Sequence, residues 1–125
     1  MEDAMANILI VDHYSSVREL LMEELVCEGY TVAALFKVES VREVIERSKP
    51  DIVLWDPVVE EGKEWDMLRN IKEHHPSLPV LVVTSYEGYQ DDPRLTHADG
   101  YVIKNSGFDE LKQKISHLLR HQQKH

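Results

Sequence analysis

Five short runs of apolar residues alternate along the chain with longer segments in which apolar residues recur every three or four positions. The short runs cover residues 8–11, 30–35, 52–55, 80–83 and 101–103, and each is predicted to be a strand. The first run is apolar on both faces, which is typical of a central parallel strand. The longer segments carry one apolar helical face each: Val17, Leu20, Leu21 and Leu25; Val38, Val41, Val44 and Ile45; Trp65, Leu68 and Ile71; Phe108, Leu111, Ile115 and Leu118. This alternation predicts a parallel sheet with helices on both faces.

Right-handed crossovers leave few arrangements of such a sheet, and for five strands the predicted order is 2-1-3-4-5. The predicted fold class is therefore α/β, a three-layer sandwich of five strand–helix units. Ser15 or Ser16 is predicted as the N-cap of the first helix, and Gly29 as its stop. The segment from Glu87 to Asp99 has few apolar residues, so the fourth helix is predicted to be short or irregular.

Length and charge limit the kind of protein. The chain has 125 residues, which predicts one domain over residues 1–125, with a core from about 7 to 120 and a polar tail at 121–125. We expect the segment from His117 to His125 to fray. Asp and Glu outnumber Lys and Arg by 23 to 14, and the resulting net charge of −9 argues against direct binding of nucleic acid.

The apolar runs and the cysteine content predict a cytoplasmic protein. No apolar run is long enough to cross a bilayer. Cys27 is the single cysteine, which excludes an internal disulfide and is typical of a reducing compartment. Because Cys27 lies among the apolar residues of the first predicted helix, we expect a buried, unreactive thiol.

Polar residues with complementary chemistry follow four of the predicted strands. Asp12 follows the first strand, Asp56 the third, Thr84 the fourth and Lys104 the fifth. Parallel strands bring these positions to one edge of the sheet, so the four side chains are predicted to converge. A carboxylate can act as a nucleophile toward phosphorus, while a divalent cation, an ammonium and a hydroxyl stabilise phosphoryl oxygens. The set therefore suits phosphoryl transfer.

The same segments resemble a known family. Residues 8–12 (ILIVD), 51–56 (DIVLWD), 80–85 (VLVVTS) and 100–104 (GYVIK) look like the motifs of CheY-like receiver domains of two-component response regulators. The resemblance spans about residues 7–119, in the family's order and near its spacing. It implies a flavodoxin-like fold and signalling through a conformational switch.

The resemblance also implies a role for individual residues. Asp56 would accept a phosphoryl group from a sensor histidine kinase or a phosphotransfer protein. Asp12, Asp56 and the backbone carbonyl of Val58 would hold Mg²⁺. Lys104 would pair with the phosphorylated carboxylate.

Two further residues would form the switch. Thr84 would be the switch hydroxyl that moves toward the phosphoryl group, and Tyr101 the switch aromatic that rotates with it. The alternative for Tyr101 is an ordinary surface aromatic at the start of a strand.

Three positions depart from the family pattern. His13 stands where the family usually has a second acidic residue, which predicts weaker Mg²⁺ binding because Mg²⁺ prefers oxygen ligands. His13 either points to solvent or serves as a ligand, for which Zn²⁺, Ni²⁺ or Cu²⁺ would be better suited. Pro57 removes a backbone donor beside Asp56, and Asn105 replaces the Pro that generally follows the family's Lys.

Three functions remain open from the sequence. The leading hypothesis is a receiver phosphorylated on Asp56, which catalyses at most its own phosphotransfer and dephosphorylation and acts on a downstream protein or output domain as a monomer or weak dimer. The second is a degenerate receiver that binds a partner independently of phosphorylation. The third, a small-molecule enzyme on the same fold, is disfavoured by the acidic loop after the first strand, which would repel a phosphate without a metal.

Overall fold

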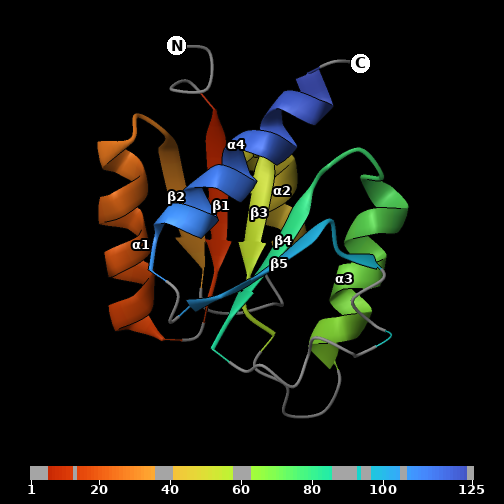
Figure 1. Ribbon diagram of the computed structural model, residues 1–125. Helices are drawn as coiled ribbons and strands as arrows, with labels where there is room; N and C mark the ends of the chain where they lie inside the picture. Colours follow the sequence, from red (N-terminus) through yellow and green to blue (C-terminus); the bar gives the residue numbers. More distant parts are fainter. Residues whose placement is uncertain are drawn as a thin grey trace.

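A five-stranded parallel sheet forms the centre of the molecule, in the order β2-β1-β3-β4-β5. The computed structural model describes residues 6–12, 14–35, 41–57, 63–85, 93, 97–104 and 107–123, excluding the side chains of 63–65 and 121–123. The strands are β1 (Asn7–Val11), β2 (Thr31–Leu35), β3 (Ile52–Trp55), β4 (Val80–Thr84) and β5 (Gly100–Ile103). The predicted α/β class, strand order and (βα) sandwich are confirmed, and Figure 1 shows β1 and β3 side by side.

Four helices are described: α1 (Ser15–Cys27), α2 (Val41–Ser48), α3 (Lys63–His74) and α4 (Asp109–Gln123). The helix labelled α4 corresponds to the last predicted helix, which follows the fifth strand, and not to the short fourth helix that was predicted between the fourth and fifth strands. The predicted short helix between β4 and β5 falls largely outside the described residues, which include Pro93 and then resume at His97. Within the described ranges, none of the helices combines the length and the apolar character needed to cross a bilayer.

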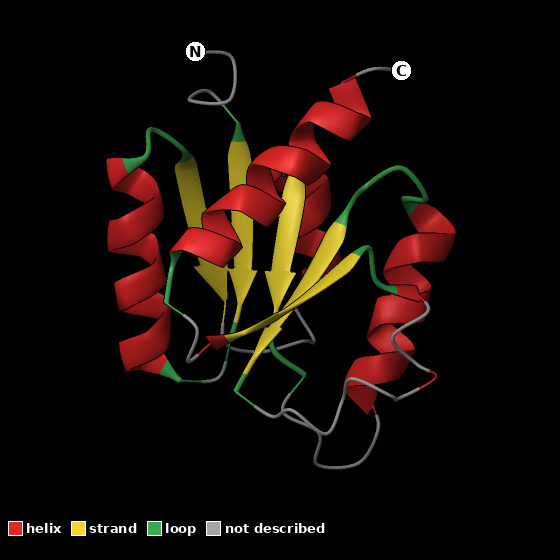
Figure 2. Ribbon diagram, in the orientation of Figure 1, coloured by secondary structure: helices red, strands yellow, loops and turns green. Residues whose placement is uncertain are grey.

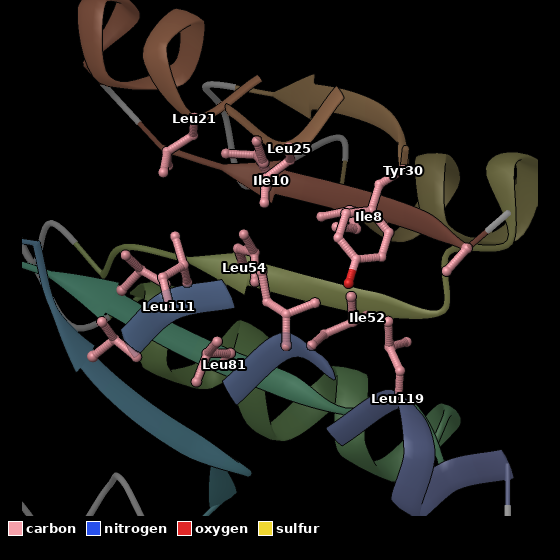
Figure 3. Packing of buried hydrophobic residues seen from close by; sticks show 14 residues of the cluster. Ile8, Ile10, Leu21, Leu25, Tyr30, Ile52, Leu54, Leu81, Leu111 and Leu119 are labelled. Carbon is pink, nitrogen blue, oxygen red and sulfur yellow. The ribbon is translucent and has the colours of Figure 1, made fainter. Parts of the chain in front are cut away.

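The strands alternate their side chains between two apolar layers. Figure 2 shows that helices lie on both sides of the sheet. One layer joins the sheet to α1 and α4, and its buried members include Ile8, Ile10, Leu25, Ile52, Leu54, Leu111 and Leu119, as seen in Figure 3. The other joins the sheet to α2 and α3, and includes Leu9, Val11, Val44, Ile45, Val53, Leu68 and Ile71. Both faces of the three central strands, β1, β3 and β4, are therefore largely buried, whereas the edge strands β2 and β5 are mostly half-buried.

The α1 helix ends as predicted but begins differently. Gly29 has a φ of 101°, and its N–H donates to the carbonyl of Val26 while the N–H of Tyr30 donates to Leu25. This left-handed stop is one that glycine adopts readily. The prediction of a serine N-cap was wrong, because Ser15 is already the first helical residue and Tyr14 occupies the capping position without a side-chain cap.

Two predictions about the apolar face of α1 were also wrong. Leu21 and Leu25 are buried, whereas Leu20 is half exposed and Cys27 is exposed. Cys27 lies two residues beyond Leu25, a rotation of about 200° that places it on the far side of the helix. The thiol of Cys27 is therefore not buried.

The α4 helix continues further than predicted. It extends to Gln123, although we expected fraying from His117 onward. Leu111, Ile115 and Leu119 are all buried at a spacing of four, so the apolar contact with the sheet reaches into the polar end of the chain. This stripe anchors the helix through its third turn.

Candidate functional site

Asp12 and Asp56 lie side by side because they follow neighbouring strands. Val11 of β1 pairs with Trp55 of β3, so the next residue of each strand reaches the same edge of the sheet. The backbone N–H of Asp56 donates to the carbonyl of Val11 at 3.0 Å, and that of Asp12 donates to Leu35 at 3.0 Å. Asp12 is only 2% exposed and Asp56 only 5% exposed. Two carboxylates are thus held at one nearly dry position.

Lys104 joins the two carboxylates. Lys104 follows β5, which is two strands away from β3 in the sheet. The long lysine side chain therefore has to span about 10 Å between these strands to reach Asp56. Its Nζ donates to Oδ2 of Asp12 at 2.7 Å and to Oδ2 of Asp56 at 2.5 Å. Because the Lys104 side chain is itself mostly buried, these are charge-assisted bonds with little solvent screening.

Thr84 completes the cluster from β4, the strand between β3 and β5. It is buried, and its side chain is hydrogen-bonded to Asp56. The structure therefore brings together Asp12, Asp56, Thr84 and Lys104, as the strand ends predicted.

Tyr101 lies on β5, where it pairs with Val82, two residues before Thr84. Residues two apart on a strand point to the same face, so Tyr101 and Thr84 share a face of the sheet. Tyr101 is half-buried against the apolar layer of α2 and α3. His13 and Val58, the other predicted ligands, lie outside the described residues.

The charges of the cluster shift two ionisation equilibria. Burial raises the pKa of Asp56 most strongly, the Lys104 ammonium lowers it, the Asp12 charge raises it and Thr84 lowers it. The net result is an Asp56 pKa above its ordinary value. Burial alone would lower the pKa of Lys104, but hydrogen bonds and attraction from both aspartates outweigh this, so its pKa is raised. Lys104 is therefore a cation throughout the neutral range.

The raised pKa of Asp56 predicts a gain in stability when its charge is removed. An acid whose pKa is higher in the folded protein favours folding while protonated, and this contribution is lost as the pH rises through the folded pKa. We therefore expect Asp56→Asn to have a larger free energy of unfolding than the wild type at pH 7, in the absence of metal. The difference should vanish below the ordinary Asp value of 3.8. Urea denaturation in a chelating buffer at several pH values measures it, and a less stable Asp56→Asn protein at pH 7 would contradict the expectation.

The sequence did not reveal two residues that support Asp12. The N–H of Tyr14 donates to Oδ1 of Asp12 at 2.9 Å, and Nη1 of Arg18 donates to the Asp12 backbone carbonyl at 2.6 Å. The Tyr14 ring also lies over the Lys104 ammonium, with Nζ 5.6 Å from the ring centroid. Their proximity to Asp12 in the chain was visible, but the direction of their side chains was not.

The donor set suits a small divalent cation. Asp12 and Asp56 contribute two negative charges and Lys104 one positive charge, which leaves the cluster with a net charge of −1. Mg²⁺ is commonly bound by one or two carboxylates together with water. Among the described residues, no group of three or more His, Cys, Asp or Glu side chains lies together in a way that could hold a metal ion.

Known proteins are similar to this chain in sequence and fold. TrrA from Thermotoga maritima, in a crystal structure with Mg²⁺–BeF, is 32% identical and superimposes with a TM-score of 0.84, over 91% of this chain and 99% of TrrA. A second structure, of TrrA with the histidine kinase ThkA, gives 32% identity and a TM-score of 0.84, over 92% of this chain and 99% of the other. TcrX, a probable transcriptional regulatory protein of Mycobacterium tuberculosis, is 27% identical over 91% of this chain and 50% of its own length.

The family match covers most of the chain. The response regulator receiver domain matches residues 8–116, which include all four members of the cluster. The chain spans about half the length of the first curated relatives it matches. With the sheet order and the four clustered side chains, this match shows that the chain belongs to the receiver domains of two-component response regulators.

Proposed function

We propose that the protein is a phosphoacceptor whose Asp56 receives a phosphoryl group from a histidine kinase or a phosphotransfer protein. The observation that carries the proposal is the ion-pair network in which Lys104 binds Asp12 and Asp56 together. A network of two carboxylates and one ammonium positions a nucleophile, offers oxygens to a cation and keeps a positive charge beside the reacting group. The structure of TrrA with a histidine kinase supports the same class of donor.

The residues of the cluster divide the chemistry of the transfer. A carboxylate oxygen of Asp56 attacks phosphorus, a new O–P bond forms, and the bond from phosphorus to the donor breaks with its electron pair remaining on the donor. The Lys104 ammonium moves from the carboxylate oxygen of Asp56 to a phosphoryl oxygen. The Thr84 hydroxyl donates a hydrogen bond to another phosphoryl oxygen. Thr84 and Tyr101, which share a face of the sheet, then change position together and alter the surface around β4 and β5.

Mg²⁺ is the proposed cofactor, held by Asp12, Asp56 and the backbone carbonyl of Val58. When bound, it neutralises charge on the phosphoryl oxygens. His13 replaces the oxygen ligand that the family usually has at this position, so we propose weaker Mg²⁺ binding than in a receiver with two acids there.

We propose a cytoplasmic protein that acts on another protein or on an output domain, as a monomer or weak dimer. The net charge of −9 disfavours contact with nucleic acid by this chain itself. Any contact with DNA would then come from the output partner.

Beryllofluoride binding tests the proposal without a kinase. In the presence of Mg²⁺ we expect it to change the amide chemical shifts of residues around Asp56, Thr84 and Lys104, and to leave the shifts of Asp56→Asn unchanged. Asp66→Asn is the matched control, because Asp66 is an exposed aspartate on α3 and its loss changes the net charge equally. Identical, unshifted spectra for wild type and Asp56→Asn would contradict the proposal and favour a phosphorylation-independent binding module.

A further inference from the structure

Tyr14 contacts both charges of the ion-pair network. Its backbone N–H donates to Oδ1 of Asp12, and its ring lies 5.6 Å from Nζ of Lys104. An ammonium within about 6 Å of an aromatic ring is attracted by the negative charge on the ring face. Tyr14 as a whole is 54% exposed, so core packing does not account for the place of its ring over the ammonium.

A divalent cation would compete with Lys104 for the same two carboxylates. Nζ binds Oδ2 of Asp12 and Oδ2 of Asp56, and these two carboxylates are the ones proposed to hold Mg²⁺. Any contact that stabilises Nζ between the carboxylates therefore favours the metal-free arrangement. A ligand shifts such an equilibrium only by the difference in its affinity for the two arrangements. Each contact that holds the ammonium between the carboxylates therefore reduces the net free energy of Mg²⁺ binding.

We propose that Tyr14 is a positioning residue whose ring holds the Lys104 ammonium between the two carboxylates and thereby lowers the affinity of the site for Mg²⁺. This inference rests on the proposed function, since it takes Asp12 and Asp56 to be the metal ligands. The backbone bond from Tyr14 to Asp12 is retained in every variant except proline. Replacing the side chain therefore tests the ring separately from the loop that carries it.

Calorimetric titration with Mg²⁺ alone measures the effect on affinity. We expect Tyr14→Leu to bind Mg²⁺ about two- to fivefold more tightly than wild type, because a partly exposed contact of this kind is weak. Tyr14→Phe keeps the ring and should bind Mg²⁺ as the wild type does. Val26→Ala is the matched control, because Val26 is an apolar α1 residue that is similarly exposed, and its affinity should be unchanged.

A metal-free measurement tests the contact itself. Protons beside Nζ of Lys104 lie near the Tyr14 ring and should show an upfield ring-current shift in the NMR spectrum. The shift should persist in Tyr14→Phe and disappear in Tyr14→Leu. A Lys104 signal that is the same in all three proteins would overturn the inference.

The titration separates this inference from the proposed function. Tighter Mg²⁺ binding by Tyr14→Leu, with Tyr14→Phe unchanged, is the expected result. Equal or weaker binding by Tyr14→Leu, with a wild type that binds Mg²⁺, would overturn the role of the ring alone. A wild type that binds no Mg²⁺ would overturn the metal site of the proposed function and this inference together.

Discussion

Replacing Lys104 by methionine should lower the free energy of unfolding by about 3 to 5 kcal/mol, the cost typical of leaving a buried charge without its partner. Methionine keeps most of the apolar stem of the lysine, so the loss reports on the ammonium and not on packing. Asp12 and Asp56 would then lie side by side, buried and without the cation that both bind. Urea denaturation of the metal-free proteins at pH 7 measures the change.

The pH dependence and a matched variant identify the cause. Loss of the ammonium raises the pKa of Asp56 further, because Lys104 is one of the groups that lowers it. The loss in free energy of unfolding caused by Lys104→Met should therefore be present at pH 7. It should become smaller as the pH falls and Asp56 takes up a proton. Lys112→Met is the control. Lys112 also pairs with two acids, Glu24 and Glu28, but near the surface. The free energy of unfolding of the Lys112→Met protein should therefore change little. Equal effects of the two substitutions would contradict a special role for the buried network.

A double variant provides the second check on the same prediction. Lys104→Met combined with Asp56→Asn leaves only one buried carboxylate, so much of the lost stability should return. Residues in direct contact give non-additive changes in the free energy of unfolding, and the departure from additivity measures their coupling. Additive effects would show that Lys104 and Asp56 do not depend on one another.

The second large effect is expected for Asp12→Asn, which should weaken Mg²⁺ binding at least tenfold. A carboxylate about 4 Å from another charge contributes on the order of 4 kcal/mol at an effective dielectric constant of 20, and the release of Lys104 offsets part of this. The Asn side chain has nearly the same shape and can still accept the hydrogen bond from Tyr14. Calorimetric titration with Mg²⁺ measures the affinity.

The control for Asp12→Asn has to change the net charge by the same amount. Asp66→Asn does so on the exposed surface of α3, where the side chain is 73% exposed, and its Mg²⁺ affinity should equal that of the wild type. An Asp12→Asn protein that still bound Mg²⁺ as the wild type does would exclude Asp12 from the metal site.

Much of the fold followed from the apolar pattern. The run from Ile52 to Trp55 became β3 with the predicted bounds, because four consecutive apolar residues between two aspartates suit a short, fully buried strand. Errors arose where a local pattern competed with tertiary contacts. The polar end of α4 is helical since Leu119 packs in the core, which the histidine and glutamine residues around it concealed.

The site was predictable as a position but not as a network. Parallel strands necessarily end at one edge, and this places Asp12, Asp56, Thr84 and Lys104 together whatever their rotamers. The bridge from Lys104 to both carboxylates, and the Tyr14 ring above it, depend on side-chain torsions that a strand pattern does not specify. The contacts that set the charge balance of the site therefore required the structure.

Phosphorylation by acetyl phosphate, mapped by mass spectrometry, tests the central claim most directly. With Mg²⁺ present, we expect the wild-type protein to gain the mass of one phosphoryl group, located on the peptide that contains Asp56. Chelation of Mg²⁺ and the Asp56→Asn substitution should each abolish the gain, while Asp66→Asn should retain it. A phosphoryl group on another residue, or none at all on a folded protein that binds Mg²⁺, would contradict the assignment of Asp56 as the acceptor.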